Sequence, residues 1–348
     1  MDLLTHGLAS FAVARGFFPR AGRVVIVGTV LAGCLANLDE LSTYFGAPAA
    51  LAWQGTYLQS LLAAVVIALL VSVAVLAISL GSFFSKAWKT EEAAAAHFSI
   101  STLALAPLLA ALLHLALDAC QSSGVMLLWP FNTKRFAMDW LPSLDPWILT
   151  ILVLAIAVPE LLRLVSSEIG AKSKQFRGRT GALIGLAFVT VYIGVRATLH
   201  ANAVALMESR TFHGEPARRC LAFPEALSLL SWHGIAETES ALNQIDVNLA
   251  ATASFDPDTS VRVFKPEPSP TLQAAGNTRV AKQFLATAQM PRANVEKTDV
   301  GFVVILRDLR YAALGDTRQE ILALIELDPA NHVTSEEVMW ARELRGLY

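Results

Sequence analysis

Long apolar runs without charged residues fill the first 205 or so residues, and they constrain this chain more than any other feature. A membrane-spanning helix needs about 20 mostly apolar residues. Backbone polar groups have to be paired inside a bilayer, so such runs are expected to be helical. Four runs meet this length, at residues 58–84, 98–119, 147–165 and 181–204. The sequence therefore predicts a polytopic integral membrane protein, with the lipid bilayer as its first partner.

The composition agrees with this prediction. The chain is 54% hydrophobic and 16% charged, whereas soluble domains carry about 25% charged residues. Its formal net charge is −2, which offers no basic surface for nucleic acid. We therefore expect no nucleic-acid partner.

Two shorter segments bring the predicted number of membrane helices to about six. Residues 24–36 are almost wholly apolar, and residues 3–18 are interrupted only by His6 and Arg15. With six spans the chain starts outside, and positive charge is expected on the inner loops. The two outer-loop cations are Lys134 and Arg135, against ten on the inner loops: Arg15, Arg20, Arg23, Lys86, Lys89, Arg163, Lys172, Lys174, Arg177 and Arg179. Both termini are then outside, which for a bacterial inner membrane is the periplasm.

Residues 206–348 have a different character, because charged residues and prolines return. Short β-type runs occur at 245–249, 261–264, 300–306 and 320–327, separated by turn residues. Residues 333–347 fit a closing helix, with Thr334 as its N-cap and Glu337 at the capping-box position. The predicted architecture is an all-α membrane domain over residues 1–205, followed by a small, mostly-β soluble domain over residues 206–348.

Ionisable groups in apolar spans are costly, so each one suggests a function. In the six-span arrangement several of them reach the outer ends of the helices. Neutral imidazoles and carboxylates suit zinc and related divalent ions. The alternative is that these groups are hydrogen-bonded pairs at helix ends. The candidate ligands are His6, Asp39, His114 and Asp118, with Asp2, Asn37 and His200 as weaker candidates.

Several of these residues lie in segments that resemble the YdjM-like membrane-bound metal-dependent hydrolases. The opening Met1-Asp2 with Thr5-His6 resembles the start of that family. The best match runs from His114 to Trp140: the pair His114 and Asp118, then Gly124, Leu127-Leu128-Trp129-Pro130-Phe131 and Arg135. The family's His/Asp pattern is similar to that of zinc-dependent phospholipases C and related nucleases. The resemblance implies a phosphoester or lipid-like substrate, with His6, Asp39, His114 and Asp118 as zinc ligands.

The chain departs from the family pattern at three positions. Where family members carry two histidines before the third span, this chain has Gln54 and Gln59. The first aspartate of the family's Pro-Asp-x-Asp motif is replaced by Asn37. Amides are poor zinc ligands, although zinc catalysis needs only three protein ligands and water.

Two functional hypotheses follow. The first is a membrane-bound metal-dependent hydrolase with a partly degraded, mononuclear site. The alternative is a non-catalytic membrane protein of the same fold whose C-terminal domain binds an envelope partner. A transporter is disfavoured, because the spans show no inverted repeat and the polar residues gather at one face.

Arg196 within the last span needs a carboxylate partner. Glu160 lies towards the wrong end of its helix. Asp39 and Asp118 are therefore the predicted partners, as they match the depth of Arg196.

Overall fold

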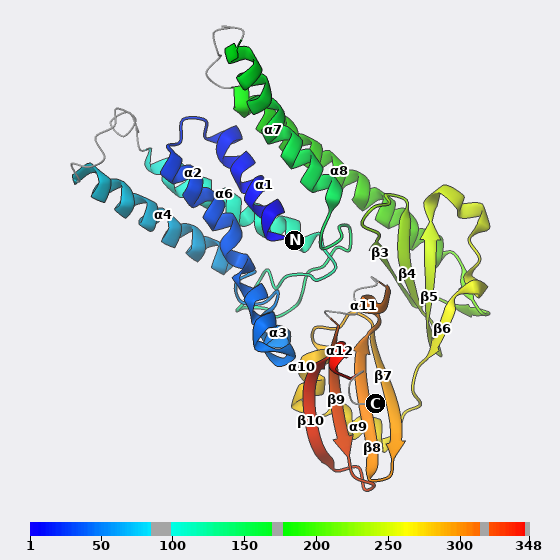
Figure 1. Cartoon of the computed structure of the whole chain (residues 1–348). Coiled ribbons are helices and arrows are strands. Elements are labelled where there is room, and N and C mark those ends of the chain that lie inside the picture. The colour runs from blue at the N-terminus through cyan, green and yellow to red at the C-terminus, as the bar shows by residue number, and fades with distance from the viewer. Residues whose placement is uncertain (85–98, 169–176, 314–319, 345–348) are drawn as a thin grey trace. The chain divides into compact units, whose positions relative to one another are not determined.

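The computed structural model describes residues 1–84, 99–168, 177–313 and 320–344 (Figure 1). The chain divides by its internal contacts into two compact units. The first contains Met1–Asp39 and Gly55–Arg196, and the second contains Glu40–Gln54 and Ala197–Tyr348. One of the boundaries, between Arg196 and Ala197, falls inside a continuous helix.

The first unit is helical. Each apolar run predicted as a span forms a helix, because its backbone groups are all paired within the segment. The helices are α1 (Leu3–Phe17), α2 (Arg23–Cys34), α4 (Leu61–Phe84), α6 (Ile100–Ala119), α7 (Pro146–Glu168) and α8 (Arg177–Glu208). A 3-10 helix, η1 (Leu35–Phe45), extends α2.

Within the described residues, five helical segments are long and apolar enough to cross a membrane: Arg23–Phe45, Leu61–Leu80, Ile100–Ala119, Pro146–Leu164 and Gly178–Glu208. The predicted polytopic architecture is thus confirmed. The first predicted span is α1, a helix of 15 residues. At about 1.5 Å per residue it is shorter than the hydrocarbon core of about 30 Å. Four of the predicted inner-loop cations, Lys86, Lys89, Lys172 and Lys174, lie outside the described residues.

Helix α6 packs against α1, α2 and α4. Small residues make this close packing feasible, as they do in other membrane bundles. Ala106 and Ala110 of α6 are completely buried. At Gly33 of α2, a Cβ atom would lie 1.8 Å from Oγ of Ser10 and 3.6 Å from Cβ of Ala110. The absence of a side chain there lets the backbone of α2 approach both α1 and α6.

The second unit contains two four-stranded antiparallel sheets, with strand orders β3-β4-β5-β6 and β10-β9-β8-β7. Each of the four predicted β-type runs lies within a strand to within one residue at its ends. The strands are β1 (Thr211–Phe212), β2 (Glu215–Pro216), β3 (Arg219–Pro224), β4 (Ser231–Glu237), β5 (Ala241–Asn248), β6 (Val261–Phe264), β7 (Pro291–Thr298), β8 (Gly301–Asp308), β9 (Ile321–Leu327) and β10 (Val333–Trp340).

Short helices complete the second unit. Helix α3 (Ala47–Trp53) lies within the predicted membrane domain, but it packs Ala47, Ala50 and Leu51 into the core of the second sheet. The same core contains residues of α9 (Pro270–Gly276) and α10 (Arg279–Leu285). The remaining elements are α11 (Leu309–Ala313), α12 (Ala341–Leu344), η3 (Leu249–Ser254) and η4 (Pro257–Thr259).

The helix predicted for residues 333–347 is wrong. Residues Val333–Trp340 form β10, which pairs with β9 from Val333 opposite Leu327 to Trp340 opposite Ile321. Strand β9 is buried along nearly its whole length, so it needs a neighbour on both edges to pair its backbone groups. That tertiary demand overrides the local capping signal of Thr334 and Glu337. A helix begins only at Ala341.

Candidate metal centre

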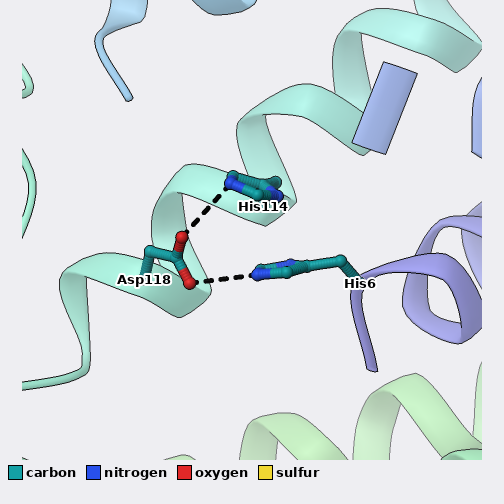
Figure 2. Close-up of side chains that lie close together, drawn as sticks. All are labelled: His6, His114 and Asp118. Atoms are coloured by element: carbon teal, nitrogen blue, oxygen red, sulfur yellow. Dashed lines mark hydrogen bonds and ion pairs between the residues drawn. The ribbon is translucent and has the colours of Figure 1, made fainter. Parts of the chain in front are cut away.

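His6, His114 and Asp118 come together from two helices of the first unit (Figure 2). His6 lies in the second turn of α1, whose N-cap, Asp2, accepts hydrogen bonds from the backbone nitrogen and the hydroxyl of Thr5. His114 and Asp118 are four residues apart on α6, so both side chains lie on the same face of that helix. The packing of α1 against α6 completes the group.

The distances within the group are short. Nε2 of His6 lies 3.0 Å from Oδ1 of Asp118, and Nε2 of His114 lies 3.2 Å from Oδ2 of the same carboxylate. The two imidazole rings are stacked, with their centroids 3.8 Å apart. One candidate ligand atom from each residue lies within 4.8 Å of the others. All three side chains are buried.

A backbone carbonyl fixes the orientation of the His114 ring. Nδ1 of His114 lies 2.7 Å from the carbonyl oxygen of Gly33. A carbonyl only accepts hydrogen bonds, so Nδ1 carries a proton and donates it. In the neutral ring Nε2 then has a lone pair, and it is this atom that faces Asp118. A ligand histidine held through its other nitrogen is the usual arrangement in metal sites.

The Asp118 carboxylate has further partners at Oδ1. The α-ammonium group of Met1 lies 2.5 Å from this oxygen, and Nε2 of Gln121 donates to it at 2.7 Å. These contacts, like that of His6, are all made by Oδ1. The contact described for Oδ2 is the one with Nε2 of His114.

Asp39 lies outside the three-residue group, although it is buried in the same unit. Its Oδ2 accepts a hydrogen bond from the backbone nitrogen of Gly55 at 2.7 Å, and the side chain of Gln59 also bonds to the carboxylate. Gly55 has a left-handed backbone with φ of 67°. Gln59, one of the two glutamines that stand at family histidine positions, is therefore a hydrogen-bond donor to a candidate ligand.

The three weaker candidates have other roles. Asp2 is the N-cap of α1, and Nδ2 of Asn37 donates to the carbonyl oxygen of Met1 at 3.0 Å. His200 belongs to the second unit, where its ring makes an edge contact with Trp232. The structure brings none of the three into the group of His6, His114 and Asp118.

The predicted pairing of Arg196 with Asp39 or Asp118 is wrong. Arg196 is buried, its Nε donates to the carbonyl oxygen of Trp140 at 3.1 Å, and the carboxylate that acts on it is Asp145. The sequence did contain a signal for Asp145. It directly precedes Pro146 at the start of a span, which is typical of an N-cap. Its carboxylate accepts from the backbone nitrogens of Trp147 and Ile148 and from the hydroxyl of Tyr192.

Sequence reasoning also missed Gln121 and Gly33, which support the group without ionisable side chains. Gln121 follows Asp118 by three residues, a spacing at which helical side chains meet. The role of Gly33 rests on its carbonyl oxygen, so residue type alone gave no indication of it.

The residues present fit a divalent metal ion of the zinc type. Two imidazole nitrogens and one carboxylate oxygen make up the three protein ligands of a catalytic zinc site. Nδ1 of His6 is buried and makes no hydrogen bond within the described residues. The arrangement is able to hold a cation that all three ligands share.

Comparison with known proteins identifies a family. A model of a family described as the YdjM inner membrane protein matches residues 1–203. No curated protein and no solved structure matches the chain. The matched region contains His6, His114 and Asp118, and it ends within α8, before the first strand of the C-terminal sheets.

Proposed function

This chain belongs to the YdjM inner membrane protein family, and we propose that it is a metal-dependent hydrolase of phosphoester or lipid-like substrates. Its metal ligands are His6, His114 and Asp118, and zinc is the ion that this donor set suits best. The bilayer that the helices cross is the source of a lipid-like substrate.

The contact between His114 and Asp118 carries this proposal. Nε2 of His114 and Oδ2 of Asp118 face each other at 3.2 Å, and with Nδ1 donating to Gly33, both atoms are acceptors in the neutral ring. Two buried acceptors at this distance repel each other unless a proton or a metal ion lies between them. The third ligand, His6, approaches the same carboxylate from α1.

When bound, a divalent ion supplies a Lewis acid and lowers the pKa of a coordinated water towards neutrality. The chain's own residues prepare the site for that ion. The Gly33 carbonyl keeps the His114 ring in one tautomer, and Gln121 holds Oδ1 of Asp118. Burial of the group strengthens each electrostatic interaction within it. We propose Asp39 as a base beside the group, because its carboxylate interacts electrostatically with Asp118 and His114 and is oriented by the hydrogen bond from Gly55.

The rival function is a non-catalytic membrane protein whose C-terminal domain binds an envelope partner. One observation favours it: the Asp39 carboxylate is already hydrogen-bonded by Gly55 and by Gln59, an amide where the family has a histidine. In this alternative the His114 Nε2 position carries a proton, and Asp118 is a structural counterion.

A phosphodiesterase assay separates the two functions. Purified full-length protein in detergent, with bis(p-nitrophenyl) phosphate as the probe, is expected to hydrolyse it only when zinc or manganese is present. His114→Ala is expected to lose at least about 100-fold in rate, since the metal supplies the nucleophile. Asp2→Asn is the control, because asparagine also caps a helix. Absence of metal-dependent hydrolysis of both phosphodiester and phospholipid probes contradicts the enzyme, and protein that also binds no zinc supports the rival.

We also propose that the metal group and the C-terminal domain face the periplasm. Arg15, Arg20 and Arg23 lie on or beside the α1–α2 connection, at the opposite end of these helices from His6. Arg179 at the start of α8 donates to the carbonyl oxygen of Gly16, so it lies at the same end. Positive charge marks the cytoplasmic side.

Cysteine labelling in intact cells checks this orientation. Val300 is 82% exposed in the turn between β7 and β8. Val300→Cys is expected to react with a membrane-impermeant maleimide before the cells are lysed. Reaction only after lysis contradicts the orientation.

A further inference from the structure

We propose that the tip of the β3–β4 hairpin, residues 225–230, inserts into the lipid interface of the membrane that α8 crosses. The interaction surface is the apolar set Ala226, Leu227, Leu229 and Leu230, and its partner is the acyl and headgroup boundary of the bilayer. This inference does not depend on the proposed hydrolase activity.

The composition of the tip is unusual for a hairpin connection. Such connections are normally rich in Gly, Asn, Asp, Ser and Pro, whereas this one reads Glu-Ala-Leu-Ser-Leu-Leu. Leu227 is 75% exposed and Leu230 is 39% exposed. Within the tip, Glu225 is the one charged residue, and it lies at the edge, where its nitrogen bonds to the carbonyl oxygen of Ser231. Leu229 between them is half-buried, so the tip presents two exposed leucines that an apolar partner would cover.

The direction of the hairpin follows from its contacts with the end of α8, all within the second unit. Trp232 of β4 contacts His200. Two residues further along the strand, a Cβ at Gly234 would lie 2.4 Å from Sδ of Met207. Strand β4 therefore runs in the same direction as α8, and the tip, which precedes Trp232, points back towards the start of the helix.

A third contact supports this direction. Cys220 pairs with Ala236 across β3 and β4, and the carboxylate of Glu208 acts on its thiol. Burial, followed by this charge, raises the pKa of Cys220 to about 12. The open end of the hairpin thus lies at the C-terminal end of α8, and the tip lies at the opposite end of the contact.

Helix α8 connects this geometry to the bilayer, because it is continuous from Arg177 to Glu208. About 20 residues cross the hydrocarbon core, so a span that starts near Gly181 reaches the interface near His200. The tip extends two or three residues beyond Trp232, which at about 3.3 Å per residue is roughly 7–10 Å. This equals the depth of about 5–10 Å at which amphipathic segments lie in the interface.

Site-specific fluorescence tests the insertion in the full-length protein. Leu227→Cys, labelled with bimane and reconstituted into phosphatidylcholine vesicles, is compared with Val300→Cys at the exposed β7–β8 turn. Only Cys34 is replaced by serine, since Cys120 and Cys220 are buried. The Cys34→Ser protein without a new cysteine measures residual labelling.

Brominated phosphatidylcholine is expected to quench bimane at position 227 at least about threefold more strongly than at position 300, as for a group within the interface. Aqueous iodide is expected to show the reverse order. Equal iodide quenching at both positions overturns the proposal. Shielding of position 227 from both quenchers also overturns it, because the tip is then covered by protein. Leu227 is exposed, so its replacement leaves the fold intact, and an unchanged circular dichroism spectrum verifies this.

Discussion

Replacing Asp118 with asparagine is expected to lower the affinity for zinc by more than about 100-fold, because even residues that only orient a ligand change metal affinity by about 10–100-fold. Asp118 is the residue that both histidines approach, with one imidazole at each carboxylate oxygen. Asparagine keeps the shape of the side chain but has no negative charge to offer the ion. Titration of purified protein with zinc against a competing chelator measures the change.

Two further variants make this result specific. His114→Ala is expected to lose affinity to a similar degree, whereas Asp2→Asn is expected to retain the wild-type affinity, since Asp2 caps α1 and lies outside the group. Unchanged zinc affinity in Asp118→Asn contradicts the assignment. Equal losses in Asp118→Asn and Asp2→Asn contradict it as well, because they indicate a general effect on the N-terminal helix.

Replacing Asp145 with alanine is expected to destabilise the membrane domain by about 1–3 kcal/mol, the cost of leaving a buried hydrogen-bonding group without its partner. Asp145 is the carboxylate that acts on the buried Arg196, and it also accepts from Tyr192 and from two nitrogens at the start of α7. Loss of the helix cap adds about 1 kcal/mol to that cost. The thermal midpoint of the purified protein in detergent reports the effect.

A second substitution separates the charge from the cap. Asp145→Ala combined with Arg196→Met measures the electrostatic interaction of the two residues, and the loss in the double variant is expected to be smaller than the sum of the two single losses. Asp145→Asn keeps the capping oxygen and is expected to lie between wild type and Asp145→Ala. A midpoint for Asp145→Ala within experimental error of wild type contradicts the pairing.

The helical part of the fold was largely predictable from the sequence, because span length and backbone pairing leave an apolar run few alternatives. The strands at residues 245–249 and 320–327 were predictable from a different signal, since each β-type run lies between turn residues. Residues 333–347 were not predictable from local signals. The capping pattern there favours a helix, whereas pairing with the edge of β9 favours a strand. The edge of β9 can be identified only from the assembled sheet.

The site was predictable in part. The i, i+4 spacing of His114 and Asp118 follows from helix geometry alone, and the structure places His6 beside them. The position of Asp39 depends on the turn at Gly55, whose left-handed backbone is not evident from a single glycine. Depth in the membrane alone does not identify the carboxylate that acts on Arg196, because several carboxylates lie at a similar depth. Asp145 directly precedes α7, at the same end of the bundle.

The segment Glu40–Gln54 shows a further limit. It lies within the predicted membrane domain of residues 1–205, yet α3 within it packs Ala50 and Leu51 against a sheet formed by residues more than two hundred positions later. Its apolar residues gave no periodic pattern long enough to indicate a partner. Contacts between segments so distant in sequence are set by the tertiary fold.

The metal content of the wild-type protein tests the central claim most directly. Full-length protein is purified in detergent, incubated with excess zinc, passed through a desalting column and analysed for metal and protein together. We predict about one tightly held zinc ion per chain, as expected for a site of three protein ligands. Protein that leaves the column without metal contradicts the account, and leaves His6, His114 and Asp118 as a structural hydrogen-bonded group.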